Sequence, residues 1–176
     1  MSHRTRIPIG GIKFSDERAH YTIYRPLSEQ ATINDFLQRI THKQVNISFL
    51  CHTLEGVFSR TCFCVSIKDI PSISEIINDS SLNEVDIATQ LQVGSITIFP
   101  HRNDITLIAV IMSLMESLEL PVYSFCTSIS ALIYNTRFIE LENIANHLTD
   151  ICELPENHSP FHPEFQLRQP RNSIAQ

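Results

Sequence analysis

The chain has 176 residues, 43% of them hydrophobic and only 18% charged, so it can bury a core, and disorder along its whole length is excluded. Thirteen Lys and Arg residues against nineteen Asp and Glu residues give a net charge of −6, and no segment gathers the basic residues that a nucleic-acid surface needs. The longest apolar stretch, residues 105–115, is shorter than the roughly 20 residues that cross a bilayer. We therefore expect a soluble protein that binds neither nucleic acid nor a membrane.

The N-terminal segment and the cysteines bear on the cellular compartment. Residues 1–11 contain basic side chains but no apolar segment of the kind found in secretory signals. The chain has five cysteines, an odd number that does not fit a framework of paired disulfides, so we expect reduced thiols. The sequence therefore predicts a cytoplasmic protein.

The first predicted elements are a strand and a helix. Residues 20–25 have the pattern of a strand, and Thr32 is the predicted N-cap of the helix that follows. The apolar residues of this helix recur at the i, i+3, i+4, i+7 spacing of one buried face; they are Ile33, Phe36, Leu37 and Ile40. The spacing predicts a helix that packs on a sheet.

A predicted hairpin and a second helix complete the first half of the chain. Apolar and polar residues alternate over 45–51 and over 61–67, on the two sides of Gly56, which is the period of strands with one covered face. A short helix is predicted to begin at Pro71, and a further strand at 84–89. This order, β-α-β-β-α-β, is that of a ferredoxin-like unit.

The same order begins again in the second half. A strand is predicted at 94–99, a helix from its cap Asp104 to about Glu119, and strands at 122–127 and 131–135. The last predicted helix has one apolar stripe, made of Leu141, Ile144, Ala145, Leu148 and Ile151. Repetition of an element order along a chain indicates a duplicated domain.

We therefore predict an α+β fold of two ferredoxin-like units, residues 9–90 and 91–153, each an antiparallel sheet with helices on one face. The helix at 105–118 is apolar around more of its circumference than one sheet covers, which favours a homodimer or tight packing of the two units. Residues 154–176 contain several prolines and no apolar period, which predicts a flexible or extended tail.

Three segments carry a resemblance to a known family. The most specific is LPVYSFCTSISALIY at 120–134, which includes the Thr-Ser pair at 127–128; the others are Val-Asn at 45–46 and CFCV at 62–65. Together with the element order, they resemble the tandem ACT domains that form the regulatory region of aspartate kinases, over residues 9–152. The sequence has neither a GxxxxGK[ST] loop nor a GxGxxG turn, so nothing in it resembles the kinase domain.

This resemblance implies a regulatory module without catalytic activity or cofactor. It implies a homodimer that binds a small ligand, an amino acid, at an interface between ACT-like domains and acts on an enzyme of amino-acid metabolism. Backbone N–H groups at a helix N-terminus suit a carboxylate, and nearby side-chain oxygens suit an ammonium group. The residues that match the family's effector-binding positions are Ser28, Gln30, Ala31, Thr32, His52, Thr53, Arg102, Asn103, Asp104, Thr127 and Ser128.

The same positions depart from the family pattern. The Pro-Gly pair that precedes the helix in the family is Gln-Ala at 30–31 and Ile-Thr at 105–106, so no glycine allows close approach of a ligand to the backbone. Arg102 and Asp104 offer a replacement charge pair for an amino acid, although Asp104 is equally expected as a helix cap. A structural interaction module that has lost effector binding is therefore the alternative function.

The cysteines offer a further chemical interpretation. Cys62 and Cys64 are two residues apart on one predicted strand, so their sulfur atoms share a face, and Cys51 or His52 on the preceding strand is a candidate third ligand for a metal ion. The spacing is not that of a CxxC site, and small buried thiols are common in cores, so we predict no metal. The sequence also lacks a GxSxG or HExxH motif, and we predict no enzyme.

Overall fold

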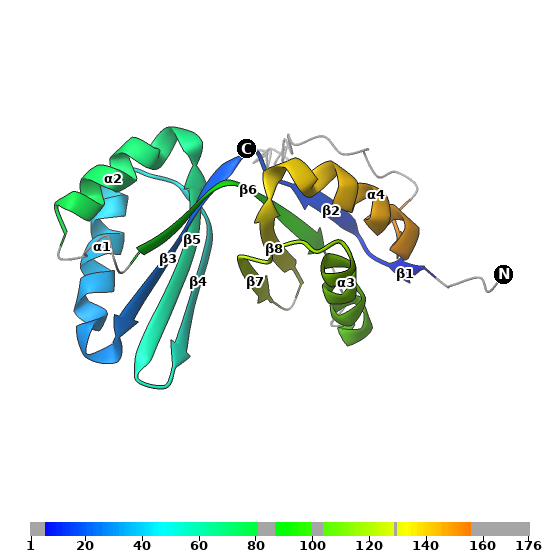
Figure 1. The fold of residues 1–176 in the computed structure, drawn as a ribbon, viewed down its shortest axis with the longest axis horizontal. Helices are drawn as coiled ribbons and strands as arrows, with labels where there is room; N and C mark the ends of the chain where they lie inside the picture. Colours follow the sequence, from blue (N-terminus) through cyan, green and yellow to red (C-terminus); the bar gives the residue numbers. More distant parts are fainter. Residues whose placement is uncertain (1–5, 81–86, 100–103, 129, 156–176) are drawn as a thin grey trace, which may run out of the picture.

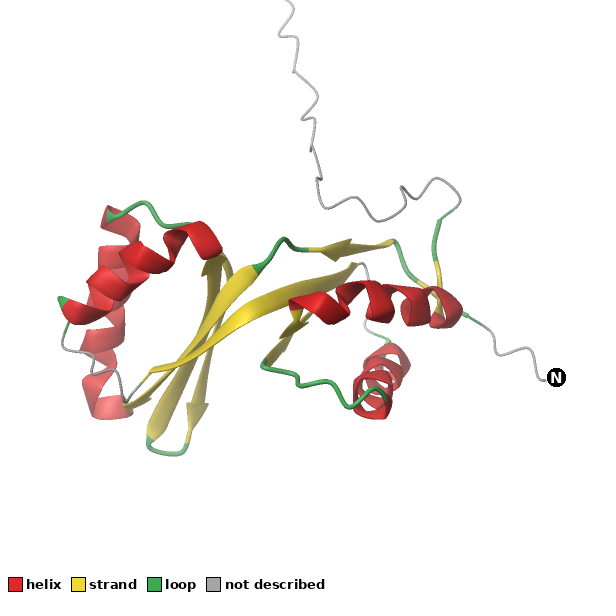
Figure 2. Ribbon diagram, turned by 45° about the horizontal axis from the view of Figure 1, so that its top comes forward, coloured by secondary structure: helices red, strands yellow, loops and turns green. Residues whose placement is uncertain are grey.

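One long strand, β6 (Ile87–Phe99), runs through two lobes that each combine strands with two helices (Figure 1). The computed structural model describes residues 6–80, 87–99, 104–128 and 130–155. Figure 2 shows the two pairs of helices at opposite sides of the molecule with the strands between them. The architecture is the predicted α+β arrangement of helices on one face of antiparallel sheets.

The first lobe has the predicted β-α-β-β-α-β order. Its strands pair antiparallel in the order β4-β5-β3-β6, and its helices lead out of short 3-10 turns. The elements are β3 (Arg18–Pro26), η1 (Leu27–Glu29), α1 (Gln30–His42), β4 (Ile47–Glu55), β5 (Phe58–Ser66), η2 (Ile67–Asp69), α2 (Ile70–Asn78) and the first half of β6. The turn between β4 and β5 contains Gly56, with φ of 64°, as a hairpin turn requires.

Helix α1 buries the predicted face but begins earlier than predicted. Ile33, Phe36 and Ile40 are buried against the sheet. The N-cap is Glu29, and Thr32 lies inside the first turn, so the prediction of Thr32 as the cap is wrong. The reason is local: the 3-10 turn η1 already sets helical geometry from Leu27 on, and α1 continues it.

Strand β6 replaces the two separate strands predicted at 84–89 and 94–99, of which residues 84–86 lie outside the described part. Its pairing with β3 shifts by one residue, so that Leu91 and Gln92 together oppose the single residue Ala19, and Gln92 has a φ of 57°. Such a bulge bends and twists a strand. The bulge therefore lets one strand leave the first sheet and continue into the second.

The second lobe uses both ends of the described chain. Its strands pair in the order β7-β8-β6-β2. The elements are β1 (Ile7–Pro8), β2 (Gly11–Phe14), the second half of β6, α3 (Ile105–Ser117), β7 (Ser124–Thr127), β8 (Leu132–Arg137), η4 (Phe138–Glu140), α4 (Leu141–Ile151) and β9 (Cys152–Glu153). Strands β1 and β9 form a small parallel pair of their own.

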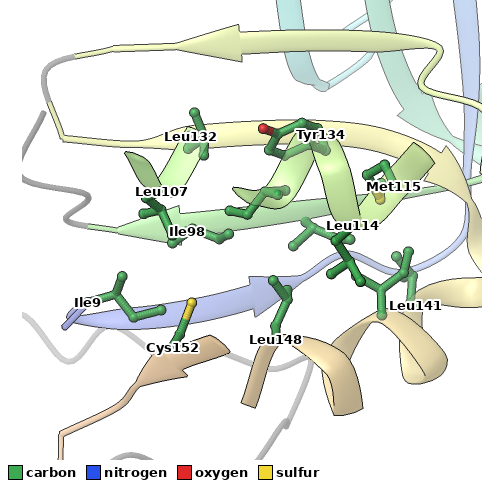
Figure 3. Packing of buried hydrophobic residues seen from close by; sticks show 13 residues of the cluster. Ile9, Ile98, Leu107, Leu114, Met115, Leu132, Tyr134, Leu141, Leu148 and Cys152 are labelled. Carbon is green, nitrogen blue, oxygen red and sulfur yellow. The ribbon is translucent and has the colours of Figure 1, made fainter. Parts of the chain in front are cut away.

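Strand β2 pairs with the second half of β6, from Gly11 opposite Phe99 to Phe14 opposite Ile96, and so packs with the second core. It takes the sheet position that the fourth strand of a ferredoxin-like unit fills. Figure 3 shows Ile9, which lies between β1 and β2, beside Cys152. The sequence had placed residues 9–90 together; the hydrogen bonds instead put the start of this range with the later lobe.

The lobes meet through the helix-free faces of their sheets. Phe49, Cys62 and Cys64 of the first lobe form a small apolar cluster that includes Cys126 and Ile133 of the second. Each helix pair covers the opposite face of its sheet, so tertiary contacts tie the two lobes together beyond the shared strand β6.

Helix α3 is only partly covered. Leu107, Ile111 and Met115 are buried in the second core, whereas Ile105 is 78% and Met112 is 42% exposed. The apolar side chains around this helix thus exceed what its own sheet covers. No helix in the described ranges is both long enough and apolar enough to span a membrane.

Candidate functional site

The candidate ligand residues of the first lobe lie where β3 gives way to α1. Ser28 and Ala31 are exposed, and Gln30 and Thr32 are half-buried. No side chain caps the N-terminus of η1 or of α1. At this end the N–H of Leu27 already donates to the carbonyl oxygen of Val57 at 2.9 Å, and the N–H of Gln30 donates to the carbonyl oxygen of Leu27. The ligand-binding role that the resemblance implies for this turn stays a prediction.

Arg25, at the end of β3, adds a buried cation to the turn. It is 8% exposed, and its Nη1 atom lies 2.9 Å from Oε2 of Glu29. The Oε1 atom of the next residue, Gln30, is buried and has no hydrogen-bond partner among the residues that the structure describes. A buried carbonyl oxygen without a donor is costly unless a ligand or water supplies one. The turn thus combines a buried cation that is already paired with Glu29 and a buried acceptor, the Oε1 atom of Gln30.

Sequence reasoning did not single out Arg25 as a site residue. The signal that could have found it is the alternation of β3: Tyr21 and Ile23 face the helices, and Arg25 is the next residue of that series. A basic residue at an inward position of a strand needs a partner, and such a position is a reason to look for one.

His52 and Thr53 are exposed on β4, and Nδ1 of His52 lies 2.8 Å from Oγ1 of Thr61 on β5. Strand β5 separates β4 from β3, so these two residues share the sheet with Arg25 but lie two strands away from it. The structure therefore does not bring them to the turn that holds Gln30 within one chain.

In the second lobe, Arg102 and Asn103 lie outside the described residues. Asp104 is the N-cap of α3, and its Oδ1 atom accepts a hydrogen bond of 2.8 Å from the backbone N–H of Thr106. Of the two interpretations of Asp104 that the sequence allows, a ligand contact and a helix cap, the structure shows the cap.

Thr127 and Ser128 are exposed at the end of the edge strand β7. The backbone N–H of Ser128 donates to the carbonyl oxygen of Ala131 at 2.8 Å, and Oγ of Ser128 accepts from the N–H of Ala131 at 3.1 Å. These bonds close the turn into β8. Strands β7 and β6 run in the same direction with β8 between them. Thr127 and Ser128 therefore lie at the same end of the strands as the C-terminal end of β6.

The predicted ligand residues that the structure describes are divided between the two lobes. In Figures 1 and 2 the start of α1 and the start of α3 are far apart. One chain therefore does not assemble them into one site, and an interface that includes both requires a second copy.

The cysteines are free thiols, and three of the five are buried: Cys62, Cys64 and Cys152. Burial raises the pKa of the Cys64 thiol to about 12, so this thiol is protonated at neutral pH when no metal ion is bound. Among the described residues, no group of three or more His, Cys, Asp or Glu side chains is placed to hold a metal ion. The cysteine cluster is thus a part of the lobe junction.

His20 is a second residue that sequence reasoning missed. It is 1% exposed on β3, and its Nε2 atom lies 2.9 Å from Oγ of Ser124, which begins β7. Ser124 also accepts a hydrogen bond of 2.8 Å from Nδ2 of Asn135 on β8. Burial, and secondarily the positive charge of Arg60, lower the pKa of His20 to about 4. The neutral imidazole therefore links the two lobes at neutral pH.

Comparison with solved structures identifies this architecture. The regulatory subunit of aspartate kinase from Thermus thermophilus, in a ligand-free form, superimposes with a TM-score of 0.69 at 9% identity, over 82% of this chain and 99% of that chain. The aspartokinase alpha and beta subunits match with a TM-score of 0.65 at 13% identity, over 80% and 95% of the two chains. This chain has the tandem ACT fold. No protein-family model and no curated protein matches its sequence.

Whole aspartate kinases match the tandem ACT fold with a part of their length. Escherichia coli aspartokinase III, in complex with lysine and aspartate, has a TM-score of 0.58 at 8% identity, over 87% of this chain but only 35% of the kinase. The matched share agrees with that of a regulatory region. The resemblance in element order was therefore a correct indication of the fold.

Proposed function

We propose that this tandem ACT protein is a cytoplasmic, non-catalytic regulatory module. In this proposal it binds an amino acid at an interface between ACT-like domains, as a homodimer, and passes occupancy to an enzyme of amino-acid metabolism. The support is the shared fold of aspartate kinase regulatory subunits and the lysine complex of one neighbour that contains this fold. The two lobes together supply the residues; the sequence proposed them as units 9–90 and 91–153, whereas β2 pairs within the second lobe and β6 crosses residue 90.

The structural feature that supports ligand binding is the turn between β3 and α1. Arg25, in competition with its partner Glu29, and the backbone N–H of Ser28 would hold the carboxylate, and the buried Oε1 atom of Gln30 would accept from the ammonium group. A domain that pairs with this turn would contribute the remaining ligand contacts. They are His52 and Thr53 of the first lobe and, from the second half of the chain, Arg102, Asn103, Asp104, Thr127 and Ser128. The exposed apolar residues Ile105 and Met112 of α3 support a contact with a second copy.

The test is a thermal-shift screen of the twenty amino acids with the full chain. A ligand at 100 times its dissociation constant adds about 2.7 kcal/mol of stability. In the variant Gln30→Met we expect the affinity for the responding amino acid to fall about tenfold, because the buried acceptor is lost. Gln38→Met, an exposed position on the same helix, is the matched control and should bind as the wild type does. No response of the wild type to any of the twenty compounds would refute ligand binding.

A specific observation favours the alternative, a structural interaction module. The tip of the β4–β5 hairpin exposes large apolar side chains, with Leu54 at 65%, Val57 at 71% and Phe58 at 50%. The family's Pro-Gly pair is absent at 30–31, and Ser128 is engaged in its own turn. If this alternative holds, light scattering detects a dimer, and neither its mass nor its dissociation constant changes on addition of amino acids.

A further inference from the structure

A polar pocket lies beside the segment that joins the two lobes. Its volume is about 180 Å³, and it lies next to the loop between β2 and β3. Its walls come from β2, β3, β4, β6 and β8, so both lobes contribute. The lining residues are Lys13, Phe14, Ser15, Asp16, Arg18, Ser48, Ser95, Thr97 and Ile133. None of them belongs to the ligand residues that the sequence predicted.

The pocket holds two basic residues that lack an acidic partner. Neither Lys13 nor Arg18 forms an ion pair within the described ranges of the chain. The Nε atom of Arg18 is buried and has no hydrogen-bond partner there. A buried guanidinium N–H without an acceptor costs free energy that a bound anion would offset. Asp16, which is exposed, is the acidic side chain among the lining residues, so the lining carries a net charge of about +1 at neutral pH.

The hydrogen bonds around the pocket fix its wall. The backbone N–H of Ser95 donates to Oγ of Ser15 at 2.9 Å, and Oγ of Ser15 donates to the carbonyl oxygen of Asp16 at 2.7 Å. Ser15 also donates its own N–H to the carbonyl oxygen of Ser95 at 3.0 Å. The loop that carries Asp16 is therefore tied to β6 before any ligand arrives, which lowers the entropy cost of binding.

The hydroxyl groups add further donors. Thr97 is half-buried, and its hydroxyl has no partner among the described residues, whereas Ser48 donates to the carbonyl oxygen of Cys64 at 3.1 Å. The guanidinium group of Arg18, the hydroxyl group of Thr97 and the ammonium group of Lys13 are all hydrogen-bond donors. Such a combination of donors suits an oxyanion, such as a carboxylate or a phosphate group.

We infer that this junction pocket binds a small oxyanion, namely a carboxylate or phosphate group, through Arg18, Lys13 and Thr97. The volume accepts inorganic phosphate or a short carboxylic acid and is below the range of sites for larger organic ligands. Bound anion would join β2 and β6 of the second lobe to β3 and β4 of the first, and so stiffen the junction. The inference does not depend on amino-acid binding at the β3–α1 turn.

The experiment is calorimetric titration of the full chain at constant ionic strength with chloride as the balancing anion. The separate arms are inorganic phosphate, acetate and glycine, which distinguish a phosphate, a bare carboxylate and a zwitterion as the source of the oxyanion. We expect saturable binding of at least one of them with a stoichiometry near one per chain. Absence of saturable binding in all three arms overturns the inference.

The variants test the location. We expect Arg18→Met to weaken binding at least tenfold and Thr97→Val to weaken it severalfold. Lys68→Met, an exposed lysine on η2, is the matched control for Lys13→Met and should bind as the wild type does. Since Arg18→Met removes a partly buried side chain, circular dichroism checks its fold, and Lys13→Met and Thr97→Val keep the test valid if it unfolds. Unchanged affinity in both of these variants overturns the inference.

The outcome is separate from that of the proposed function. Gln30→Met is expected to leave the oxyanion affinity unchanged, because Gln30 lies in the β3–α1 turn and does not line the pocket. Oxyanion binding without any amino-acid response would support the pocket and refute the sensor. A loss of oxyanion binding in Gln30→Met would refute the pocket.

Discussion

The pH dependence of stability is expected to report on His20. In the folded chain burial lowers the pKa of this imidazole to about 4, while in the unfolded chain it is near 6.5. Between these two values the unfolded chain binds a proton that the folded chain does not. The free energy of unfolding therefore falls as the pH falls from about 6.5 towards about 4. At pH 6.5 the slope is about half its maximum, and above about pH 7.5 this residue contributes almost none.

The size of the stability loss follows from the difference between the pH and the pKa of His20 in the unfolded chain. At pH 5 the unfolded imidazole is protonated and the folded one is still mostly neutral, so the loss is roughly 2 kcal/mol relative to pH 7.5. A side chain that is 1% exposed gives little opportunity for solvent screening. This loss is a large share of the stability of an ordinary domain.

The assay is urea unfolding of the wild type and of His20→Gln at pH 7.5, 6.5, 5.5 and 5.0. Glutamine keeps a polar group within reach of Ser124 but does not titrate. We expect the wild type to lose about 2 kcal/mol more than the variant over this range. His42→Gln, an exposed position on α1, is the control and should follow the wild type. Parallel pH profiles for wild type and His20→Gln would refute the reasoning.

Three further predictions follow from local geometry. A Cβ atom at Gly94 would lie 2.5 Å from Cδ1 of Leu141, so Gly94→Ala should lower the free energy of unfolding by about 1–3 kcal/mol, and adding Leu141→Val should recover part of it, both measured in urea. Glu119 follows the C-cap of α3 and has a φ of 51°, so Glu119→Gly should raise the free energy of unfolding by about 1 kcal/mol and with it the melting temperature, whereas a glycine inside α3 should lower both. Under native conditions a thiol reagent should label the half-buried Cys126 and leave the buried Cys64 unmodified until the chain unfolds; mass spectrometry of the labelled peptides would expose the opposite order.

The first lobe could be predicted because its signals are local. The stripe from Ile33 to Ile40 and the alternation around Gly56 each depend on neighbours within a few residues, and the structure follows them. The pairing of β2 with β6 joins residues more than 80 positions apart. The four residues of β2 show no sequence pattern from which their partner strand could be predicted. Non-local pairing is therefore where the sequence was insufficient.

The candidate site shows the same contrast between local and distant information. The cap formed by Asp104 is visible in the sequence because it needs only its own helix. Neither the role of Arg25 nor that of Arg18 is visible, because each depends on which strand covers which face. A buried basic side chain in a strand is recognised only after the sheet order is known.

The position of β2 changes how the two lobes depend on each other. The second lobe takes one strand from before the first lobe and the rest from after it, so the first lobe is inserted within the second. The ends of that insertion are the loop at 15–17 and the bulge at Gln92, and the oxyanion pocket lies beside this loop. A ligand there would contact the place where the chain leaves the second lobe. Because the two lobes share β6 as well, a change at this junction acts on both lobes, which is the property a regulatory module needs to couple a bound ligand to a partner.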